Sequence, residues 1–471
     1  MSVLARPDVA VPAAPRRRSP GRTASRDAGV RRTAAGVLAT SLGLVTVWWV
    51  GDGGLGDLTA TPTALTSLGR WTGLVASVLL LAQVVLMARV PLLEQAYGQD
   101  RLAKVHRFVG FTSFTLMVLH VVLITWGYAA GSLALAPATL WDLVIHYPGM
   151  LLAAAGTVCL FLVVGTSIKA ARRKLRYESW HLLHLYAYLG VGLALPHQLW
   201  TGKDLSASTS RTVFWWTGWA AAAAAILIWR IGLPVWRNLR HQLRVVSVAE
   251  EAPGVLSIVM AGHRLDRLDV GAGQFMTWRF LGRTGWTRAN PYSLSAAPDG
   301  RTLRITVQAV GDGSASLARL RPGTRVLVEG PHGRLSERAR RTDGVVLIGS
   351  GVGMAPIRGL VEALDYAPGR GTLIHRFRDH ELFADEIASV AARRGLQVAR
   401  VPGPRRHPGS WLGSSVGHAH SDLQVLQWWV PDLAHRDVYV CGPTGWTDLV
   451  TDDLRRAGVP ADQVHVETFG W

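Results

Sequence analysis

Six long and nearly uncharged segments in the first half of the chain limit the folds that it can adopt. They lie at about 34–50, 72–88, 108–128, 149–168, 182–199 and 212–231 of the 471 residues. Each has close to the ~20 residues that a membrane-spanning helix needs. The pattern predicts an all-α membrane bundle of six helices over residues 34–236. We interpret the first segment as a retained helix rather than a signal peptide, because it is long and further apolar segments follow it.

Lysine and arginine gather on alternate sides of these segments. They precede the first segment and lie between the second and third and between the fourth and fifth, whereas residues 129–148 contain none. Cytoplasmic loops of membrane proteins retain positive charge, so we expect a multi-pass protein of the cell membrane with both termini in the cytoplasm. Residues 1–33 are rich in Arg, Ala, Pro and Ser without an apolar period. This composition predicts a disordered, basic cytoplasmic tail.

The net charge of +18 does not require nucleic acid as a partner. Basic clusters beside the apolar segments account for much of this charge and favour anionic lipid. We therefore expect contact with membrane lipid and no nucleic-acid binding. The two cysteines, Cys159 and Cys441, are too few for the four thiolates of an iron–sulfur cluster. An electron carrier inside the membrane would have to use histidine.

Four histidines lie in the apolar half as two pairs, His106 with His120 and His184 with His197. Titratable side chains are costly in hydrocarbon, so intramembrane histidines indicate a functional site. His106 and His120 are 14 residues apart, which is close to four helical turns and places both on one face about 20 Å apart. His184 and His197 are 13 residues apart, which leaves them about 140° out of phase in an ideal helix. Pro196 interrupts the backbone ladder there and can re-aim His197.

The third and fifth segments run in the same direction across the membrane. The first histidines of the two segments would therefore pair near the cytoplasm and the second histidines near the exterior, with one haem iron between the members of each pair. His181, one turn before His184, is the main alternative ligand, and His146 lies in a predicted exterior loop. The other interpretation is that these histidines only pack or line a pore.

After Arg230 the sequence changes to short alternating runs separated by turns. Residues 244–262 predict two strands around Pro253 and Gly254, and the runs LRITVQAV and RVLVEG predict further strands. Strands at this spacing indicate an antiparallel β-barrel, which we assign to residues 240–338.

From Val345 onward, strands, glycine turns and helices alternate. This order predicts an α/β doubly wound domain with a parallel sheet over residues 343–471. Gly349, Gly351 and Gly353 lie in a turn between a strand and a helix, where backbone N–H groups can approach a pyrophosphate. Glycines also serve ordinary tight turns, so this signal alone is weak.

Two groups in the strand-rich region suit a flavin nucleotide. Pro291, Tyr292 and Ser293 offer an aromatic face and a hydroxyl group, while Gly313 and Ser314 form a small turn suited to phosphate. Ordinary turn chemistry explains each group equally well when it is taken alone.

Six motifs occur in an order that is far more specific than any one of them. They are NPYSLSAAP at 290–298, VGDGSASL at 310–317, VEGPHG at 328–333, LIGSGVGMAPI at 347–357, YVCGP at 439–443 and VETF at 466–469. This order resembles that of ferredoxin-NADP reductase type modules. With paired histidines ahead of it, the chain from about residue 34 onward resembles the ferric reductase and NADPH oxidase superfamily.

The resemblance implies how the chain would hold FAD. Tyr292 would lie against the flavin, Ser293 would bond to it, and Ser314 would meet the pyrophosphate. Asn290 replaces the Arg or His that relatives often carry before the Pro-Tyr-Ser run. That departure affects the flavin phosphate contact, for which Arg288 is the candidate replacement.

The resemblance also implies a site for the nicotinamide nucleotide. The glycine turn and the end of a later strand would receive it, through Gly351, Gly353, Cys441, Gly442 and Pro443. Glu467 would stand near the hydride path with Cys441, and Phe469 would cover the isoalloxazine until nicotinamide displaces it. Arg376 and Arg378 follow the second strand of this domain, where a guanidinium can pair with a 2′-phosphate and favour NADPH over NADH. Surface solvation is the alternative role for these two arginines.

Together, the histidine pairs and the resemblance predict a transmembrane oxidoreductase. Electrons would pass from cytoplasmic NAD(P)H through FAD and two b-type haems to an exterior acceptor, with ferric iron or another metal chelate favoured. A superoxide-producing NADPH oxidase is the alternative: Arg70 matches an exterior arginine of that branch, but Ile124 stands where a polar residue is expected. An exterior protein acceptor also fits. A haem-free membrane scaffold or transporter with a regulatory nucleotide domain is the alternative from another class.

Overall fold

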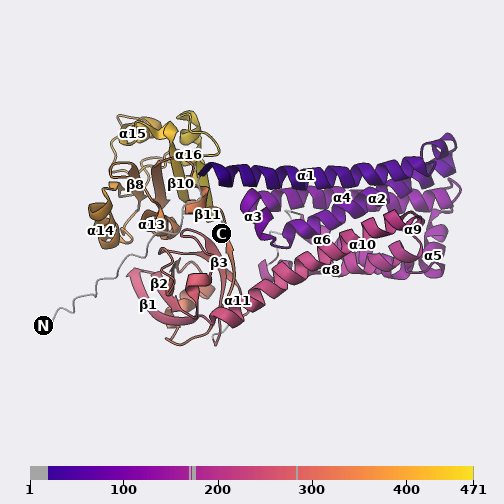
Figure 1. Cartoon of the computed structure of the whole chain (residues 1–471), viewed down its shortest axis with the longest axis horizontal. Helices are drawn as coiled ribbons and strands as arrows, with labels where there is room; N and C mark the ends of the chain where they lie inside the picture. Colours follow the sequence, from indigo (N-terminus) through magenta and orange to yellow (C-terminus); the bar gives the residue numbers. More distant parts are fainter. Residues whose placement is uncertain (1–19, 169–170, 172–174, 176, 283–284, 470–471) are drawn as a thin grey trace. The chain divides into compact units, whose positions relative to one another are not determined.

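The computed structural model describes residues 20–168, 171, 175, 177–282 and 285–469 (Figure 1). Contacts divide these residues into two compact units that meet in sequence between Leu233 and Pro234. The first unit is all-helical and begins at Ala28. The second unit contains all the described strands.

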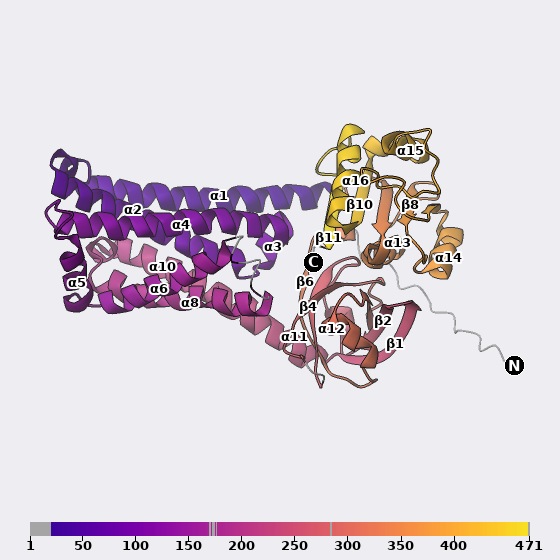
Figure 2. The ribbon, with the colours of Figure 1, turned by 180° about the vertical axis from the view of Figure 1, so that it is seen from behind.

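Long helices that lie side by side form the helical unit (Figures 1 and 2). The apolar segments predicted from the sequence correspond to the six longest of them. The helices in this half are α1 (Pro20–Gly51), α2 (Thr61–Met87), α3 (Pro91–Tyr97), α4 (Gln99–Tyr128), α5 (Ala136–His146), α6 (Met150–Ser167), α8 (Tyr177–Trp200), α9 (Lys203–Ser206) and α10 (Thr209–Ala225). A π-helical stretch, η2 (Ile226–Gly232), continues α10 into α11 (Leu233–His241).

Five described helices are long and apolar enough to cross a membrane, which agrees with the prediction that the first half is rich in candidate spanning segments. They are Ser25–Gly51, Thr61–Met87, Arg101–Tyr128, Met150–Ser167 and Thr209–His241. The predicted count of six is not confirmed, because α8 is not among them. Its 24 residues are long enough, but His184, Pro196 and His197 lower its mean hydropathy.

The structure corrects the prediction of a disordered tail over residues 1–33. Helix α1 begins at Pro20, so the prediction is wrong for residues 20–33, while residues 1–19 lie outside the described residues. Ala and Arg are good helix formers, and a helix propagates more easily than it nucleates. The apolar segment after residue 34 therefore extends backward into the polar sequence.

The predicted exterior loop over residues 129–148 also contains a helix. Helix α5 occupies 11 of these residues, with a proline in its first turn, where proline is tolerated. His146 is its last residue, and its exposed ring hydrogen-bonds the Asp142 carboxylate at 2.8 Å. This pairing accounts for His146 without a metal or a haem.

Glycines let neighbouring helices approach closely. A Cβ atom at Gly190 of α8 would lie 2.9 Å from the carbonyl oxygen of Gly156 in α6, and a Cβ atom at Gly156 would lie 2.7 Å from the carbonyl oxygen of Gly190. No side chain fits at either position, so α6 and α8 meet backbone to backbone, as small residues permit in membrane helices.

Two three-stranded antiparallel sheets follow α11. One has the order β1–β2–β5 (Arg244–Ala252, Val255–Ala261, Thr302–Gln308) and the other the order β4–β3–β6 (Asn290–Ser293, Phe275–Phe280, Val326–His332). Inward side chains from both sheets form one buried cluster around Trp278. The antiparallel strands agree with the prediction. The edge strands of the two sheets meet at the bridges Leu294–Ile305 and Arg244–Arg325, and further backbone hydrogen bonds cross these seams, such as that from the Val326 amide to the Leu243 carbonyl at 2.9 Å. A closed barrel stays a prediction.

The C-terminal part is the predicted α/β domain with a parallel sheet. Its strands are β7 (Gly344–Ser350), β8 (Gly371–Arg376), β9 (Gln397–Val401), β10 (Arg436–Pro443) and β11 (Val464–Phe469), and its helices are α13 (Met354–Ala363), α14 (Ala384–Arg394), α15 (Asp422–Trp429) and α16 (Thr444–Arg456). The strand order is β11–β10–β7–β8–β9. The chain moves from β7 to β8 and β9, then returns to the other side of β7. This reversal creates a topological switch point between β7 and β10, where such sheets bind nucleotides.

Ion pairs join the antiparallel sheets to the α/β domain. Arg304 of β5 donates two hydrogen bonds, of 2.8 and 3.0 Å, to the Glu386 carboxylate of α14. Arg358 of α13 lies 2.6 Å from the same carboxylate. Burial alone would raise the pKa of Glu386, but its hydrogen bond to Arg304 and the positive charges of Arg358 and Arg304 outweigh burial and lower this pKa.

Replacing Glu386 with Gln should destabilise the second unit in a pH-dependent manner. A lowered folded pKa contributes stability above the ordinary value of 4.5, and this contribution is lost as the pH falls through the folded pKa. We expect E386Q to unfold about 2 °C below the wild type at pH 7, because a partly exposed pair contributes at most about 1 kcal/mol. The difference should shrink below pH 4.5. The release of FAD from the full chain during heating measures this difference in unfolding temperature. Asp343→Asn, at an exposed aspartate, is the control. A difference that is the same at all pH values contradicts the account.

Candidate functional site

The four predicted histidine ligands meet as two pairs between α4 and α8. The ring centroids of His106 and His184 are 6.1 Å apart, and those of His120 and His197 are 6.3 Å apart. The ring planes are inclined by 69° and 70°. Both pairings match the sequence expectation, including the pairing of His197, which an ideal helix would misplace. Pro196 lies inside α8 directly before it and interrupts the regular ladder.

The spacing of each pair leaves room for one metal ion. Bonds from a metal to an imidazole nitrogen are about 2 Å long, so a metal between rings 6.1 or 6.3 Å apart can bind one nitrogen from each. In the part of the chain that the structure describes, no group of three or more His, Cys, Asp or Glu side chains could hold a metal ion. Two protein ligands suit a metal whose other ligands come from a macrocycle, as in haem.

Helix α2 positions His120. The Nδ1 of His120 lies 2.8 Å from the carbonyl oxygen of Gly69, to which it donates. This bond fixes the tautomer and leaves Nε2 as a metal ligand. A Cβ atom at Gly73 would lie 2.6 Å from the same Nδ1, so α2 can approach only because that residue is glycine. The sequence analysis did not identify Gly69 or Gly73, although their Gly-x-x-x-Gly spacing is a signal for close packing of membrane helices.

Small groups also surround the other histidines. The Ser167 hydroxyl donates to a backbone carbonyl of its own helix and lies 3.3 Å from the Nδ1 of His184, from which it can accept a hydrogen bond. Gly149, with φ +79°, lies against the backbone of His197, where a Cβ atom would be 2.7 Å from the amide nitrogen. The Nδ1 atoms of His106 and His197 are buried, and no described residue bonds to them.

Arg70 matches, by the sequence resemblance, an exterior arginine of the oxidase branch. In the structure, carboxylates hold its guanidinium. Its Nε donates to Asp204 at 3.0 Å and its Nη2 at 2.5 Å, and Asp52 lies 3.8 Å away. Asp52 in turn accepts two hydrogen bonds from Arg211. A guanidinium neutralised in this network is not free to stabilise a reduced oxygen species. This geometry and the apolar Ile124 both weigh against the oxidase alternative.

The Pro-Tyr-Ser run of the second unit forms β4. Tyr292 and Ser293 are 7% and 3% exposed, and the carbonyl of Tyr292 accepts a hydrogen bond from the indole of Trp278 at 2.9 Å. The Ser293 hydroxyl and the Asn290 amide nitrogen are buried without a partner among the described residues. Such orphaned polar groups call for a ligand. Their chemistry fits the ring nitrogens and carbonyls of a flavin, while Pro291 is exposed beside them.

The phosphate turn differs in detail from the expectation. The Ser314 hydroxyl accepts hydrogen bonds from the Val310 and Gly311 amides, at 3.0 and 3.2 Å, and donates to the Gly311 carbonyl. Its hydrogen-bonding capacity is therefore used within the turn. A Cβ atom at Gly313 would meet open space. A pyrophosphate would have to meet the backbone of this turn rather than the Ser314 hydroxyl.

The glycine turn and the end of β10 meet at the switch point. Gly349 pairs with Cys441 in the β7–β10 register, and a Cβ atom at Gly353 would lie 2.4 Å from the carbonyl oxygen of Cys441. Gly351 has φ +54° and open space beside it. Gly442 and Pro443 continue the same edge. The structure thus brings together the residues that the resemblance assigns to the nicotinamide nucleotide.

The three residues expected near the hydride path lie on β10 and β11. Cys441 is fully buried, and burial raises the pKa of its thiol well above the usual value. Burial therefore favours the protonated thiol of Cys441 over the thiolate. Glu467 pairs with Cys441, and its carboxylate would lie 3.2 Å from a Cβ atom at Gly333 of the antiparallel domain. Phe469 pairs with Pro443 and packs against the α/β core.

The two arginines predicted to recognise a 2′-phosphate have different environments. Arg376 is 5% exposed and donates to the carbonyls of Phe377 and Val401, so it is already engaged. Burial, followed by the charges of Arg405 and Arg378, lowers the pKa of Arg376. The side chain of Arg378 is 78% exposed and lies 3.9 Å from a neighbouring aspartate. The exposed Arg405, which the sequence prediction missed, replaces Arg376 as the second candidate.

Comparisons with known proteins identify both halves of this arrangement. The family described as ferric reductase like transmembrane component matches residues 72–195. A stretch of 244 residues is 31% identical to the ferredoxin–NAD(+) reductase component of the alkene monooxygenase system of Xanthobacter autotrophicus, covering 49% of this chain and 70% of that protein. The chain belongs to the ferredoxin reductase family. It has a ferredoxin reductase type FAD/NAD-binding module, preceded by a ferric reductase-like transmembrane domain.

Two further relatives match the reductase module. The ferredoxin reductase component of 3-ketosteroid-9-alpha-monooxygenase from Mycolicibacterium smegmatis is 31% identical over 242 residues, which cover 48% of this chain and 65% of that protein. The FAD/NAD-binding domain of nitric oxide dioxygenase from Vibrio cholerae is 24% identical, with a TM-score of 0.39, and the match covers 49% of this chain and all of that domain. The family match to the helical part includes His106, His120 and His184, and His197 lies two residues beyond it.

Replacing Gly353 with Ala should impair nucleotide binding by the reductase module. The added Cβ atom would lie 2.4 Å from the carbonyl oxygen of Cys441, so the turn must move. We expect the KM for NAD(P)H to rise at least tenfold, or about 1.4 kcal/mol, with the FAD content unchanged. Steady-state reduction of a soluble dye by the full chain measures the KM. Gly417→Ala is the control, because a Cβ atom there meets nothing within 4 Å. An unchanged KM contradicts the assignment.

Proposed function

We propose that this chain is a transmembrane oxidoreductase that passes electrons from NAD(P)H through FAD and two b-type haems to an acceptor on the far side of the cell membrane. The observation that carries the proposal is the pairing of histidines at 6.1 and 6.3 Å within apolar helices of a chain that also has a reductase module. A pair of imidazoles at this distance suits a six-coordinate haem iron.

The positive charges beside the apolar segments support a cytoplasmic location for both termini. In that orientation the reductase module meets NAD(P)H inside the cell. Electrons that move outward across an inside-negative membrane gain roughly 2.3 kcal/mol per 100 mV. The membrane potential therefore favours electron export.

FAD, when bound, takes a hydride and returns its two electrons singly, and haem iron carries one electron at a time. The residues of the chain hold and orient these groups. The Gly69 carbonyl accepts from the Nδ1 of His120, so the Nε2 of His120 would be available to bind a haem iron. The Ser293 hydroxyl and the Asn290 amide bind the flavin, and the close-packed turn at Gly353 receives the nucleotide. Phe469 stands at the end of β11, where it can cover the flavin ring.

A ferric or other metal chelate is the acceptor that the sequence resemblance favours, because it needs little more than an exposed haem edge. The engagement of Arg70 by Asp204 gives the superoxide alternative no structural support. A haem-free scaffold with a degenerate nucleotide domain is also disfavoured. The orphaned polar groups of Ser293 and Asn290 and the intact glycine turn are features of a working site.

Removing one histidine of a pair should remove one haem. We expect His184→Ala and His197→Ala each to lower the haem content of the purified full chain from about two to about one per chain, because one axial ligand does not retain b-type haem in an apolar bundle. A pyridine haemochrome assay measures the ratio. His146→Ala is the matched control, since the exposed His146 ring hydrogen-bonds the Asp142 carboxylate and belongs to neither pair. An unchanged ratio in both variants contradicts the assignment of these ligands.

Arg378 should favour NADPH over NADH. Its exposed guanidinium, together with Arg405, offers positive charge at the end of β8 for a 2′-phosphate. We expect Arg378→Ala to raise the KM for NADPH about tenfold, or 1.4 kcal/mol, and to leave the KM for NADH unchanged. Arg455→Ala, an exposed arginine on α16, is the control. Equal changes with both nucleotides would mean that Arg378 does not recognise the 2′-phosphate.

A further inference from the structure

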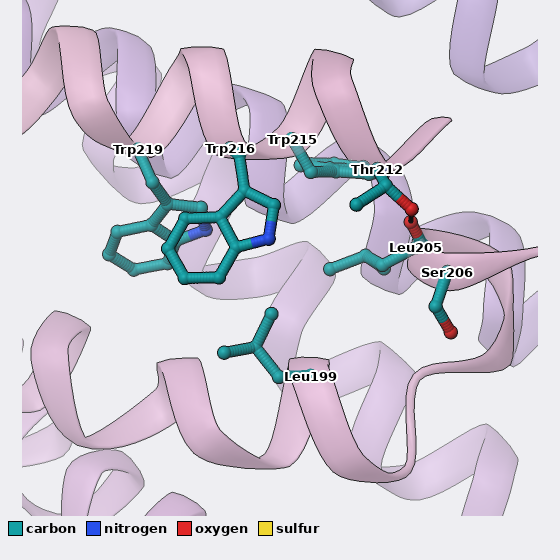
Figure 3. Close-up of a pocket in the computed structure, with 7 residues that line it drawn as sticks. All are labelled: Leu199, Leu205, Ser206, Thr212, Trp215, Trp216 and Trp219. Atoms are coloured by element: carbon teal, nitrogen blue, oxygen red, sulfur yellow. Dashed lines mark hydrogen bonds between the residues drawn. The ribbon is translucent and has the colours of Figure 1, made fainter. Parts of the chain in front are cut away.

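A cavity of about 190 Å³ lies among the end of α8, helix α9 and the first turns of α10. Aromatic and aliphatic side chains dominate its lining. The residues that matter here are Leu199, Leu205, Thr212, Trp215, Trp216 and Trp219. Figure 3 shows the tryptophans of α10 facing Leu199 and Leu205 across an open space. We call this space the tryptophan cavity.

The tryptophan cavity contains hydrogen-bond donors that the fold does not use. Trp215 is 2% exposed, and the indole N–H groups of Trp215 and Trp219 are buried without an acceptor among the described residues. Two other tryptophans of the helical unit have acceptors for their indole N–H groups. Trp49 donates to the Ser67 carbonyl at 2.9 Å, and Trp71 donates to the Thr46 hydroxyl at 3.1 Å. Buried donors without partners are rare in native proteins and call for a ligand.

No charge in the lining is available to hold an ionic ligand. Asp204, next to Leu205, is paired with Arg70, and Arg211, next to Thr212, is paired with Asp52. The Thr212 hydroxyl donates to the Ser208 carbonyl. A charged metal chelate would therefore find no partner here. The same ion pairs hold the short helix α9 against α2, so the wall that carries Leu205 is fixed in place.

The tryptophan cavity lies near the level of the second histidine pair along α8. Leu199 is two residues beyond His197, a rise of about 3 Å and a rotation of about 200°, so Leu199 and His197 project from opposite faces of α8. Trp216 is 50% exposed and forms the outer wall. In a membrane this side would face the interfacial region, where tryptophan side chains concentrate. An apolar ligand dissolved in the bilayer can enter from that side.

We infer that the tryptophan cavity binds a quinone, which takes up electrons from the His120–His197 pair across α8. A cavity of about 150 Å³ already holds benzene, so the space suits a quinone ring. The indole N–H groups of Trp215 and Trp219 donate to the quinone carbonyl oxygens, and the face of Trp216 supports the ring. This inference rests on the proposed function and adds a lipid-soluble substrate to it.

The reaction balances with NAD(P)H as the reductant. NAD(P)H gives up two electrons and one proton and becomes NAD(P)⁺. The quinone takes the two electrons one at a time and two protons from water at its side of the membrane, and its two carbonyl groups become hydroxyl groups. The hydroquinone hydroxyl oxygens accept hydrogen bonds more weakly than the quinone carbonyl oxygens, so the product is held less tightly by the two indoles and leaves.

Ligand binding to the oxidised full chain in detergent tests the inference without turnover. The probes are menadione, which has two carbonyl oxygens, and 2-methylnaphthalene, which has none. Trp215→Phe and Trp219→Phe keep an aromatic ring but remove the donor. We expect each variant to weaken menadione binding about tenfold and to leave 2-methylnaphthalene binding unchanged. Trp428→Phe, a 79% exposed tryptophan of α15, is the matched control and should bind menadione like the wild type.

Binding of both probes with equal affinity, unchanged in the two variants, would overturn the inference and identify a simple apolar slot. Absence of menadione binding to the wild type would also overturn it. Haem content and elution volume establish that each variant is folded.

In a second experiment, menadione or ferric citrate is added, without oxygen, to the full chain whose haem has been reduced by NADPH. Both variants should reoxidise their haem more slowly than the wild type with menadione. With ferric citrate, the rate of haem reoxidation should be unchanged. If NADPH does not reduce the haem at all, the proposed function fails, whereas the binding result still decides the inference.

Discussion

The separation of the paired imidazole rings constrains the whole helical unit. Each pair must stay near 6 Å in an apolar interior, so α4 and α8 cannot close on one another. Their neighbours compensate by approaching closely. Gly73 lets α2 reach His120, and Gly156 and Gly190 let α6 meet α8 backbone to backbone. Glycine contacts therefore surround a space that the histidines keep open.

Polar chemistry is arranged differently in the two units. In the helical unit, charged residues pair with one another, as Arg70 does with Asp204, and the interior retains neutral groups that lack partners, such as the indoles of Trp215 and Trp219. In the reductase module, ion pairs such as Arg304–Glu386 join two domains, and the nucleotide site depends on backbone and glycine. A neutral interior suits electron transfer, because stationary charges there would perturb each carrier.

Sequence patterns predicted the features that depend on local periodicity. Apolar length located the candidate spanning helices, and the shared direction of the third and fifth segments predicted which histidines would face each other. The remaining features depend on contacts between distant residues. The bond from His120 to Gly69 and the pairing of Arg70 with Asp204 join residues far apart in the chain. The role of Arg376 stays a prediction, and a residue pattern does not show that a strand-end side chain will turn back onto carbonyl groups, as Arg376 does.

The visible absorbance spectrum of the purified full chain, before and after NADPH is added without oxygen, tests the central claim most directly. The account predicts two b-type haems per chain, both with the spectrum of bis-histidine coordination, and reduction of both when FAD is present. A preparation without haem, or haem that NADPH and FAD leave oxidised, would contradict the claim that the histidine pairs connect the reductase module to the far side of the membrane.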